Sequence, residues 1–299
     1  MPIECTKLPD GPEPVVVEIE YPSRDQLQPV VVGESSEGEG SSLHHILNEV
    51  KQEIQSTEWA DACAGLLMLR RLTVHHPTAV AAELPTLVPH VIKSARSLRS
   101  ALSKTAFMTL NDLYVSCPGE MLPLSNVGGA AKPLDSALAQ LLLKCASNDK
   151  KFVVEEAQRT LETMAERVAP TEMVALLSPA YVLDHKNPKV RGKAAVLMAT
   201  CLHRLSPVEC HSAYGMETGV RVVARLITDN TPDAREGAKR MAGRLKMVFE
   251  DPAVVALMGD LQIEKGQGEE EKEKSRWEGW VVSVLGPSKA LPVLRATGN

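Results

Sequence analysis

The chain has 299 residues, of which 44% are hydrophobic and 24% are charged, a composition that excludes a disordered tail and a fibrous repeat. Its longest apolar stretches, such as residues 79–91, are interrupted by Glu83, Pro85 and Pro89 and stop short of the roughly 20 apolar residues that a membrane span needs. The formal net charge of −5 argues against a protein that works by binding polyanions.

The N-terminal 42 residues differ in composition from the rest of the chain. They contain nine acidic and two basic residues, a net of −7, which leaves 31 basic and 29 acidic residues, a net of +2, for the remainder. Their Pro, Gly and Ser content predicts an acidic, flexible leader over 1–42. Two apolar runs inside it, 14–21 and 29–33, either belong to a disordered segment or dock along a partner or the chain's own solenoid. The leader has no secretory signal pattern, so we interpret the six cysteines as reduced thiols of a cytosolic protein.

Helix signals recur from residue 43 to residue 263. Aromatic residues make up only 3% of the chain, whereas sheet cores are rich in them, so an α-helical fold is favoured. Four N-cap residues are followed by a proline at the first helical position, and apolar residues then recur at 3.6-residue spacing. The four pairs begin at Asn187, Ser206, Thr231 and Asp251.

These helices are expected to form hairpins. The predicted first helices are 43–55, 78–93, 133–146, 171–183 and 207–227, and the second helices begin near residues 58, 98, 149, 188 and 232. The intervals between those starts, about 40 to 51 residues, are close to the length of HEAT and armadillo repeats. One long interval contains a predicted insertion loop at 117–133. We therefore predict an all-α HEAT-repeat solenoid of about five hairpins plus a terminal helix, with extended termini.

The C-terminal region divides into two parts. Residues 264–276 are a mixed-charge run that predicts a solvated linker. Residues 277–299 are again apolar and contain Trp277 and Trp280. This tail is interpreted either as a cap on the last repeat or as a partner-binding peptide.

Sequence motifs for catalysis and for nucleotide binding are absent. Cys201, His203, Cys210 and His211 carry zinc-capable groups, but their spacing matches no usual finger or ribbon pattern. Cys201 also lies on the apolar stripe of its predicted helix, which indicates a core position. We predict neither a catalytic residue nor a metal or cofactor, and expect a binding protein.

The turns inside successive hairpins are the sharpest functional signal, because in a solenoid they line up along one edge. Four of the five turns place basic residues at helix starts, where the helix dipole favours acidic ones. A surface for an acidic partner explains this placement, although Lys and Arg are also common in any solvated turn. The first turn instead exposes Trp59, which contacts a partner or covers the end of its hairpin.

These five turns resemble those of TOG domains, the tubulin-binding HEAT arrays of the CLASP, XMAP215 and crescerin families. The segments that carry the likeness are TEWADACAGLLMLRRL (57–72), ARSLRSALSKTAFMTLNDL (95–113), HKNPKVRGKAAVLMATCL (185–202) and DNTPDAREGAKRMAGRL (229–245), with ASNDKKFVVEEAQRTL (146–161) a looser match. The resemblance covers one TOG unit, residues 43–263. It implies a flat paddle whose edge binds αβ-tubulin, with the Trp59 turn on β-tubulin and the later basic turns toward α-tubulin.

The resemblance implies a non-enzymatic protein that binds tubulin or the microtubule lattice and acts in the cytoplasm and cytoskeleton, with a role at the ciliary axoneme left open. The implied tubulin-binding residues are Trp59, Arg99, Ser100, Lys150, Lys151, Asn187, Lys189, Val190, Arg191, Asn230, Arg235 and Lys239. Residues 1–42 and 277–299 are available for other protein partners. The main alternative is a HEAT scaffold that binds an acidic protein or peptide without tubulin affinity. A nucleic-acid partner is disfavoured by the net charge of +2, and no membrane contact is expected.

Overall fold

A computed structural model of the chain describes residues 21–30, 39–124, 136–177, 181–258 and 276–298. These residues form α-helices and one short 3-10 helix, with no strand among them, which confirms the predicted all-α solenoid. The first helices of the hairpins are α1 (Glu39–Ile54), α3 (Pro77–Ala95), α6 (Ala137–Cys145), α8 (Pro170–Leu177) and α11 (Met216–Leu226). The second helices are α2 (Trp59–His75), α4 (Ser100–Ser116), α7 (Lys151–Arg167), α9 (Pro188–Arg204) and α12 (Pro232–Glu250).

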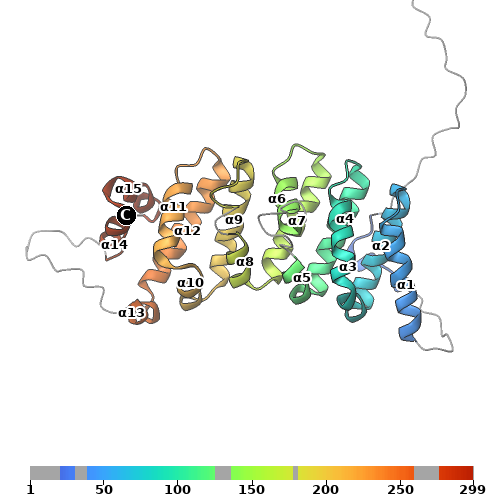
Figure 1. The fold of residues 1–299 in the computed structure, drawn as a ribbon. Coiled ribbons are helices and arrows are strands. Elements are labelled where there is room, and N and C mark those ends of the chain that lie inside the picture. The colour runs from blue at the N-terminus through green and yellow to red at the C-terminus, as the bar shows by residue number, and fades with distance from the viewer. Residues whose placement is uncertain (1–20, 31–38, 125–135, 178–180, 259–275, 299) are drawn as a thin grey trace, which may run out of the picture.

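The hairpins stand side by side in chain order and make an elongated two-layer stack (Figure 1). Three short helices, α5 (Pro118–Leu124), α10 (Pro207–Tyr214) and α13 (Pro252–Met258), follow second helices and lie along the lower edge in Figure 1. Since each second helix ends at that edge, it begins at the opposite one. The five turns inside the hairpins therefore share the upper edge, which we call the turn edge.

One predicted helix and one predicted loop differ in the structure. The segment 207–227 is divided into α10 and α11 because Gly215 adopts a positive φ of 75°, a conformation that ends the first of these helices and that favours glycine. The predicted insertion loop at 117–133 begins with helix α5 instead of coil. Its residues 125–133 lie outside the described part of the chain.

The core is built from small and branched aliphatic side chains, which lets the helices approach closely. The contact between α9 and α12 is the clearest case: a Cβ added to Gly237 would lie 2.6 Å from the backbone carbon of Ala195. Cys201, expected in the core, is fully buried there. Because helices this close leave little free space between them, the position of one hairpin constrains the position of the next.

Arginines connect the hairpins at the lower edge. Arg204 of α9 donates to the carbonyl oxygens of Ala165 and Val168 at the end of α7. Arg244 of α12 donates in the same way to Leu202 and Leu205 at the end of α9. Each arginine satisfies carbonyl groups that a helix C-terminus leaves unpaired, and its charge suits the negative end of the helix dipole.

Part of the predicted flexible leader is packed on the solenoid. Residues 21–30, which include the 3-10 helix Arg24–Gln26, lie against α2 and α4, and the side chain of Leu27 is buried. Arg71 donates to the carbonyl oxygens of Gln28 and Pro29 at 2.9 and 2.8 Å. This packing corresponds to the alternative in which part of the leader docks along the chain's own solenoid, and the arginines of α2 hold the segment by donating to its backbone carbonyls.

A buried ion pair lies beneath this segment. Arg70 of α2 and Asp112 of α4 are 2% and 1% exposed, and Nε of Arg70 donates to the Asp112 carboxylate at 2.7 Å. The Arg70 guanidinium also donates to the carbonyl oxygen of Pro22 at 2.9 Å, and Arg24 approaches the other oxygen of Asp112 at 3.4 Å. The pair thus joins the leader to the first two hairpins.

The C-terminal tail folds back on the last repeat. Helices α14 (Arg276–Leu285) and α15 (Pro287–Ala296) pack against α11 and α12. Trp277 is fully buried, and the Trp277 and Trp280 rings lie 5.5 and 4.9 Å from the ring of Phe249 at the end of α12. The two tryptophans therefore cover an apolar end of the solenoid, as a terminal cap would.

Turns four and five are joined by a clamp at the N-termini of α9 and α12. Arg191 donates from Nε and Nη2 to one carboxylate oxygen of Asp229, at 3.1 and 2.9 Å. Burial acts to raise the pKa of Asp229, but hydrogen bonds from Thr231 and Arg191 outweigh it and hold the pKa below its usual value. The clamp is therefore made by the ionised carboxylate.

We expect Asp112→Asn to destabilise the fold by about 3 kcal/mol, because it leaves the buried Arg70 guanidinium without its countercharge. Urea unfolding followed by circular dichroism measures the change. The matched control is Glu155→Gln, which breaks the exposed Lys151–Glu155 pair and should change stability by less than about 0.5 kcal/mol. Equal losses in the two variants would contradict a structural role for the buried pair.

We expect Asp229→Asn to destabilise the chain by about 1–2 kcal/mol at neutral pH. A carboxylate whose folded pKa is depressed stabilises above its unfolded pKa of about 4, and that stability is lost as the pH falls through the folded value. Thermal unfolding at a series of pH values should show wild type and variant converging below about pH 4. A difference that stays constant with pH would show that the charge is not responsible.

Candidate functional site

The five turns of the turn edge share one local geometry. In each, a side chain accepts a hydrogen bond from the backbone N–H two residues further on, which fixes the chain just before the second helix begins. The acceptors Ser56, Ser97, Ser147, His185 and Asp229 take N–H groups of Glu58, Arg99, Asp149, Asn187 and Thr231 at 2.9–3.3 Å. This repeated turn was not predicted, although Ser or Asp at that spacing is a recognisable signal.

Each turn also contacts the next one. The Arg99 guanidinium stacks over the Trp59 ring at 5.1 Å, which joins turns one and two. The Lys104 ammonium lies 5.7 Å from the Phe152 ring, which joins turns two and three. Lys189 Nζ donates to the Asn148 side chain at 3.0 Å, joining turns three and four, and the Arg191–Asp229 clamp joins turns four and five. The edge is thus a continuous surface.

Trp59 is placed differently from the prediction. It was expected to be exposed, but it is half-buried at the first position of α2 and packs against the core. Arg99 covers it from the second turn and is itself exposed, while Ser100 is half-buried at the first position of α4. A partner would therefore contact the arginine before it contacts the indole.

The third turn presents its lysines to solvent. Lys150 and Lys151 are exposed, and Lys151 forms an exposed ion pair with Glu155 at 3.5 Å. The turn also holds Asp149, whose pKa is lowered by the Lys144 ammonium 2.7 Å away and by the backbone N–H of Lys150. The ionised Asp149 offsets part of the positive charge of this turn.

The fourth turn requires one correction. Val190 was predicted to contact tubulin, but its side chain is fully buried, because it occupies the core-facing stripe of α9. Asn187 is the N-cap of α9 and its side-chain oxygen accepts the N–H of Lys189 at 3.0 Å. Lys189 is exposed, and Arg191 is half-buried in the clamp.

The fifth turn carries three of the predicted residues. Asn230 and Lys239 are exposed. Arg235 is half-buried, and its guanidinium donates to the carbonyl oxygen of Asp229 at 2.8 Å. Of the cations predicted for turns four and five, Arg191 and Arg235 thus bind groups inside the turns. Lys189 is exposed and binds the Asn148 side chain, and Lys239 is exposed about two helical turns into α12.

Leu98 is a candidate contact residue that the prediction omitted. It lies at the tip of the second turn and is fully exposed, next to the stacked Arg99. Phe152 in the third turn is 41% exposed. Large apolar side chains in such positions mark interaction surfaces when they cluster. The sequence signal was a leucine between serines and arginines, outside any helical stripe.

The described thiols have the surroundings of structural residues. Burial raises the pKa values of Cys145 and Cys201 to about 12, so both remain protonated at neutral pH and are poor nucleophiles or ligands. Among the described residues, no group of three or more His, Cys, Asp or Glu side chains is arranged to hold a metal ion. Within the same ranges, none of the helices has the length and apolarity of a membrane span.

The comparisons with known proteins agree with this architecture. The chain is 26% identical over 222 residues to TOG array regulator of axonemal microtubules protein 1 of Mus musculus, a match that covers 73% of this chain and 11% of that protein. The chain therefore spans about one-ninth of the length of this relative.

Two solved structures have the same fold. A chain from a study of microtubule plus end tracking by XMAP215, CLIP-170 and EB1 superposes with a TM-score of 0.57 at 16% identity, covering 91% of this chain and 94% of its own. A TOG domain of C. elegans Zyg9 gives a TM-score of 0.51 at 14% identity, covering 79% of this chain and 86% of its own. Both likenesses establish the TOG fold.

The sequence also matches a family model, described as CLASP N terminal, over residues 41–262. That range includes every residue of the turn edge named above and all five hairpins except the first two residues of α1. By this match the chain belongs to the CLASP N-terminal family.

Proposed function

We propose that this chain binds αβ-tubulin, as free heterodimer or in the microtubule lattice, through the turn edge. The observation that carries the proposal is the ordered set of five turns, bridged one to the next, in a chain of the CLASP N-terminal family. The name of its mouse relative, a regulator of axonemal microtubules, supports a microtubule partner. In this proposal the chain binds its partner and catalyses no reaction.

The two ends of the edge would make different contacts. Leu98, Arg99 and Trp59 form an apolar and cationic group at one end, and buried aromatic and arginine side chains are typical anchors of protein interfaces. Lysines 150, 151, 189 and 239 project farther along and offer ionic contacts to an acidic surface. We propose, from the TOG resemblance, that the Trp59 end faces β-tubulin and the lysine end faces α-tubulin.

We further propose that the chain acts as a single TOG unit in the cytoskeleton. Residues 21–30 and 276–298 would then be structural parts of that unit, since their contacts with α2, α4, α11 and α12 are extensive. The mouse relative's name favours the axoneme as one location.

We expect Leu98→Ala to weaken tubulin binding by about tenfold, the effect of removing an interface anchor, without altering the fold, because the side chain is fully exposed. The measurement is co-elution with soluble tubulin on size-exclusion chromatography. Leu257→Ala is the matched control, because Leu257 is 60% exposed in α13 on the lower edge. If both variants co-elute like wild type, Leu98 is not a contact.

We expect Lys189→Ala to weaken tubulin binding by about threefold to fivefold at low salt, the effect of losing one exposed ionic contact. The difference between wild type and variant should shrink as the salt concentration rises, because salt screens that contact. Lys189 is a sharper test than Arg191, because its side chain makes an exposed hydrogen bond to Asn148, whereas loss of Arg191 breaks the part-buried ion pair with Asp229. Wild-type protein that neither co-elutes with tubulin nor pellets with microtubules at low salt would overturn the proposal. A HEAT scaffold for another acidic protein would then remain.

A further inference from the structure

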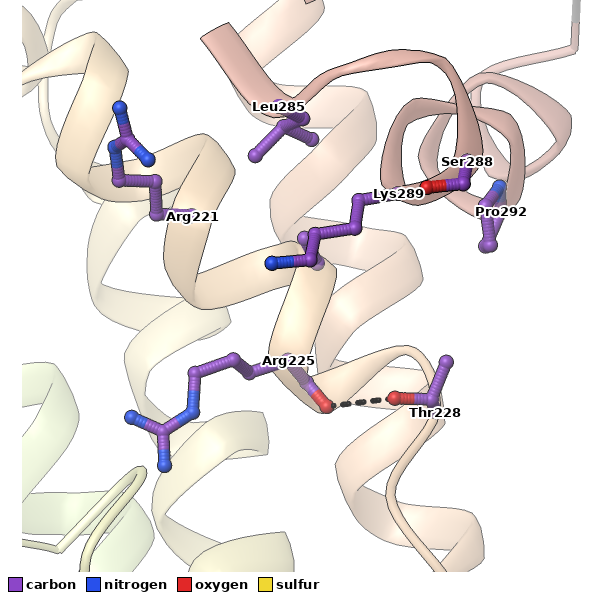
Figure 2. A pocket seen from close by; sticks show the side chains of 8 residues that line it. Arg221, Arg225, Thr228, Leu285, Ser288, Lys289 and Pro292 are labelled. Atoms are coloured by element: carbon purple, nitrogen blue, oxygen red, sulfur yellow. Dashed lines mark hydrogen bonds between the residues drawn. The ribbon is translucent and has the colours of Figure 1, made fainter.

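A cavity of about 670 Å³ lies between α11 and α15, beside the fifth turn. Arg221 and Arg225 line it from α11, Thr228 from the turn, and Ser288 and Lys289 from the start of α15. Figure 2 shows the Lys289 side chain reaching from α15 toward α11, with the Arg221 and Arg225 guanidinium groups pointing away from each other. Three cationic side chains from two helices thus line one hollow, which we call the α11–α15 pocket.

The charges of this pocket are only loosely satisfied within the protein. Arg221 pairs with Glu217 at 2.6 Å, but both side chains are more than half exposed. Arg225 lies 3.8 Å from Asp184, again with both exposed, and within the described residues Lys289 has no carboxylate within 4.0 Å. Exposed pairs of this kind contribute little to stability, so an incoming carboxylate can replace them readily.

The directions of the two arginines indicate the length of a ligand. Residues four apart on a helix are displaced by about 6 Å along its axis, and the two guanidinium groups point apart from there. Because alternate side chains of an extended peptide are displaced by about 6.6–6.8 Å on one face, the acidic residues that meet both guanidinium groups would be more than two positions apart. Leu285, Ala224 and Pro292 add apolar surface to the pocket for the aliphatic parts of such a peptide.

We propose that the α11–α15 pocket binds an extended acidic peptide segment of a partner, with separate carboxylates along the peptide paired to Arg221, Lys289 and Arg225. Guanidinium groups suit carboxylates because they bind them with two parallel hydrogen bonds. The pocket is far larger than a phosphate ion, which favours a peptide. It uses α15, which lies beyond the end of the family match at residue 262, and it does not depend on tubulin binding at the turn edge.

The test uses the full chain and a fluorescein-labelled peptide of alternating Glu and Ser, followed by fluorescence anisotropy in low-salt buffer. Arg225→Gln and Lys289→Gln should each weaken binding about fivefold or more, the effect of losing one ionic contact. Glu217→Gln should strengthen binding, because it frees Arg221. Arg167→Gln, at an exposed arginine at the end of α7, is the matched control and should leave binding unchanged.

A second peptide tests the length of the contact. With the same number of glutamates gathered at one end, binding should be weaker than with glutamates spread along the peptide, because the three cationic groups lie apart. The proposal is overturned if Arg225→Gln and Lys289→Gln bind the alternating peptide like wild type, or if Lys189→Gln on the turn edge lowers binding as much as they do. Complete displacement by inorganic phosphate at constant ionic strength would also overturn it, since the ligand would then be a phosphate group.

Discussion

The structure depends on how each hairpin is held in register with the next, because a two-layer solenoid has no central core and each repeat contacts only its neighbours. Apolar packing alone permits sliding along the helices. Here polar contacts fix the register at both edges: Arg204 and Arg244 bind the carbonyl ends of the preceding helices, and Arg191 binds Asp229 across the turn edge. The buried Arg70–Asp112 pair does the same for the first two hairpins.

This arrangement has a consequence for the turn edge. Arg191 and Arg235 donate hydrogen bonds to groups inside the protein. They therefore determine the shape of the turn edge more than they add to its exposed positive charge. In the proposed complex, exposed groups such as Leu98, Lys150 and Lys239 would contact the partner. A surface whose backbone is already fixed loses little conformational entropy on binding, which makes a series of individually weak contacts effective.

The fold could be predicted from the sequence because its signals are local: N-cap and proline pairs mark helix starts, and apolar spacing marks their faces. The site was predicted less completely, since its contacts join residues about 40 positions apart. Nothing near Trp59 indicated that Arg99 would cover it. Val190 was a different error, because its place on the apolar stripe of α9 already predicted burial. The docking of residues 21–30 depends on backbone carbonyl groups that accept hydrogen bonds from α2. Every residue has such a carbonyl, so these contacts have no sequence signature.

Three of the few aromatic residues of the chain cluster at the C-terminal end of the solenoid. Inside the stack, each hairpin covers the apolar face of its neighbour, and small residues such as Gly237 let the helices lie close together. Beyond the fifth hairpin, the helix pair α14–α15 packs against α11 and α12, and Trp277 and Trp280 of α14 cover the Phe249 ring at the end of α12. Because α15 continues from that cap, the burial of two tryptophans also fixes Lys289 opposite Arg221 and Arg225. The packing of α14 and α15 on the last repeat therefore produces both the apolar cap and the cationic pocket.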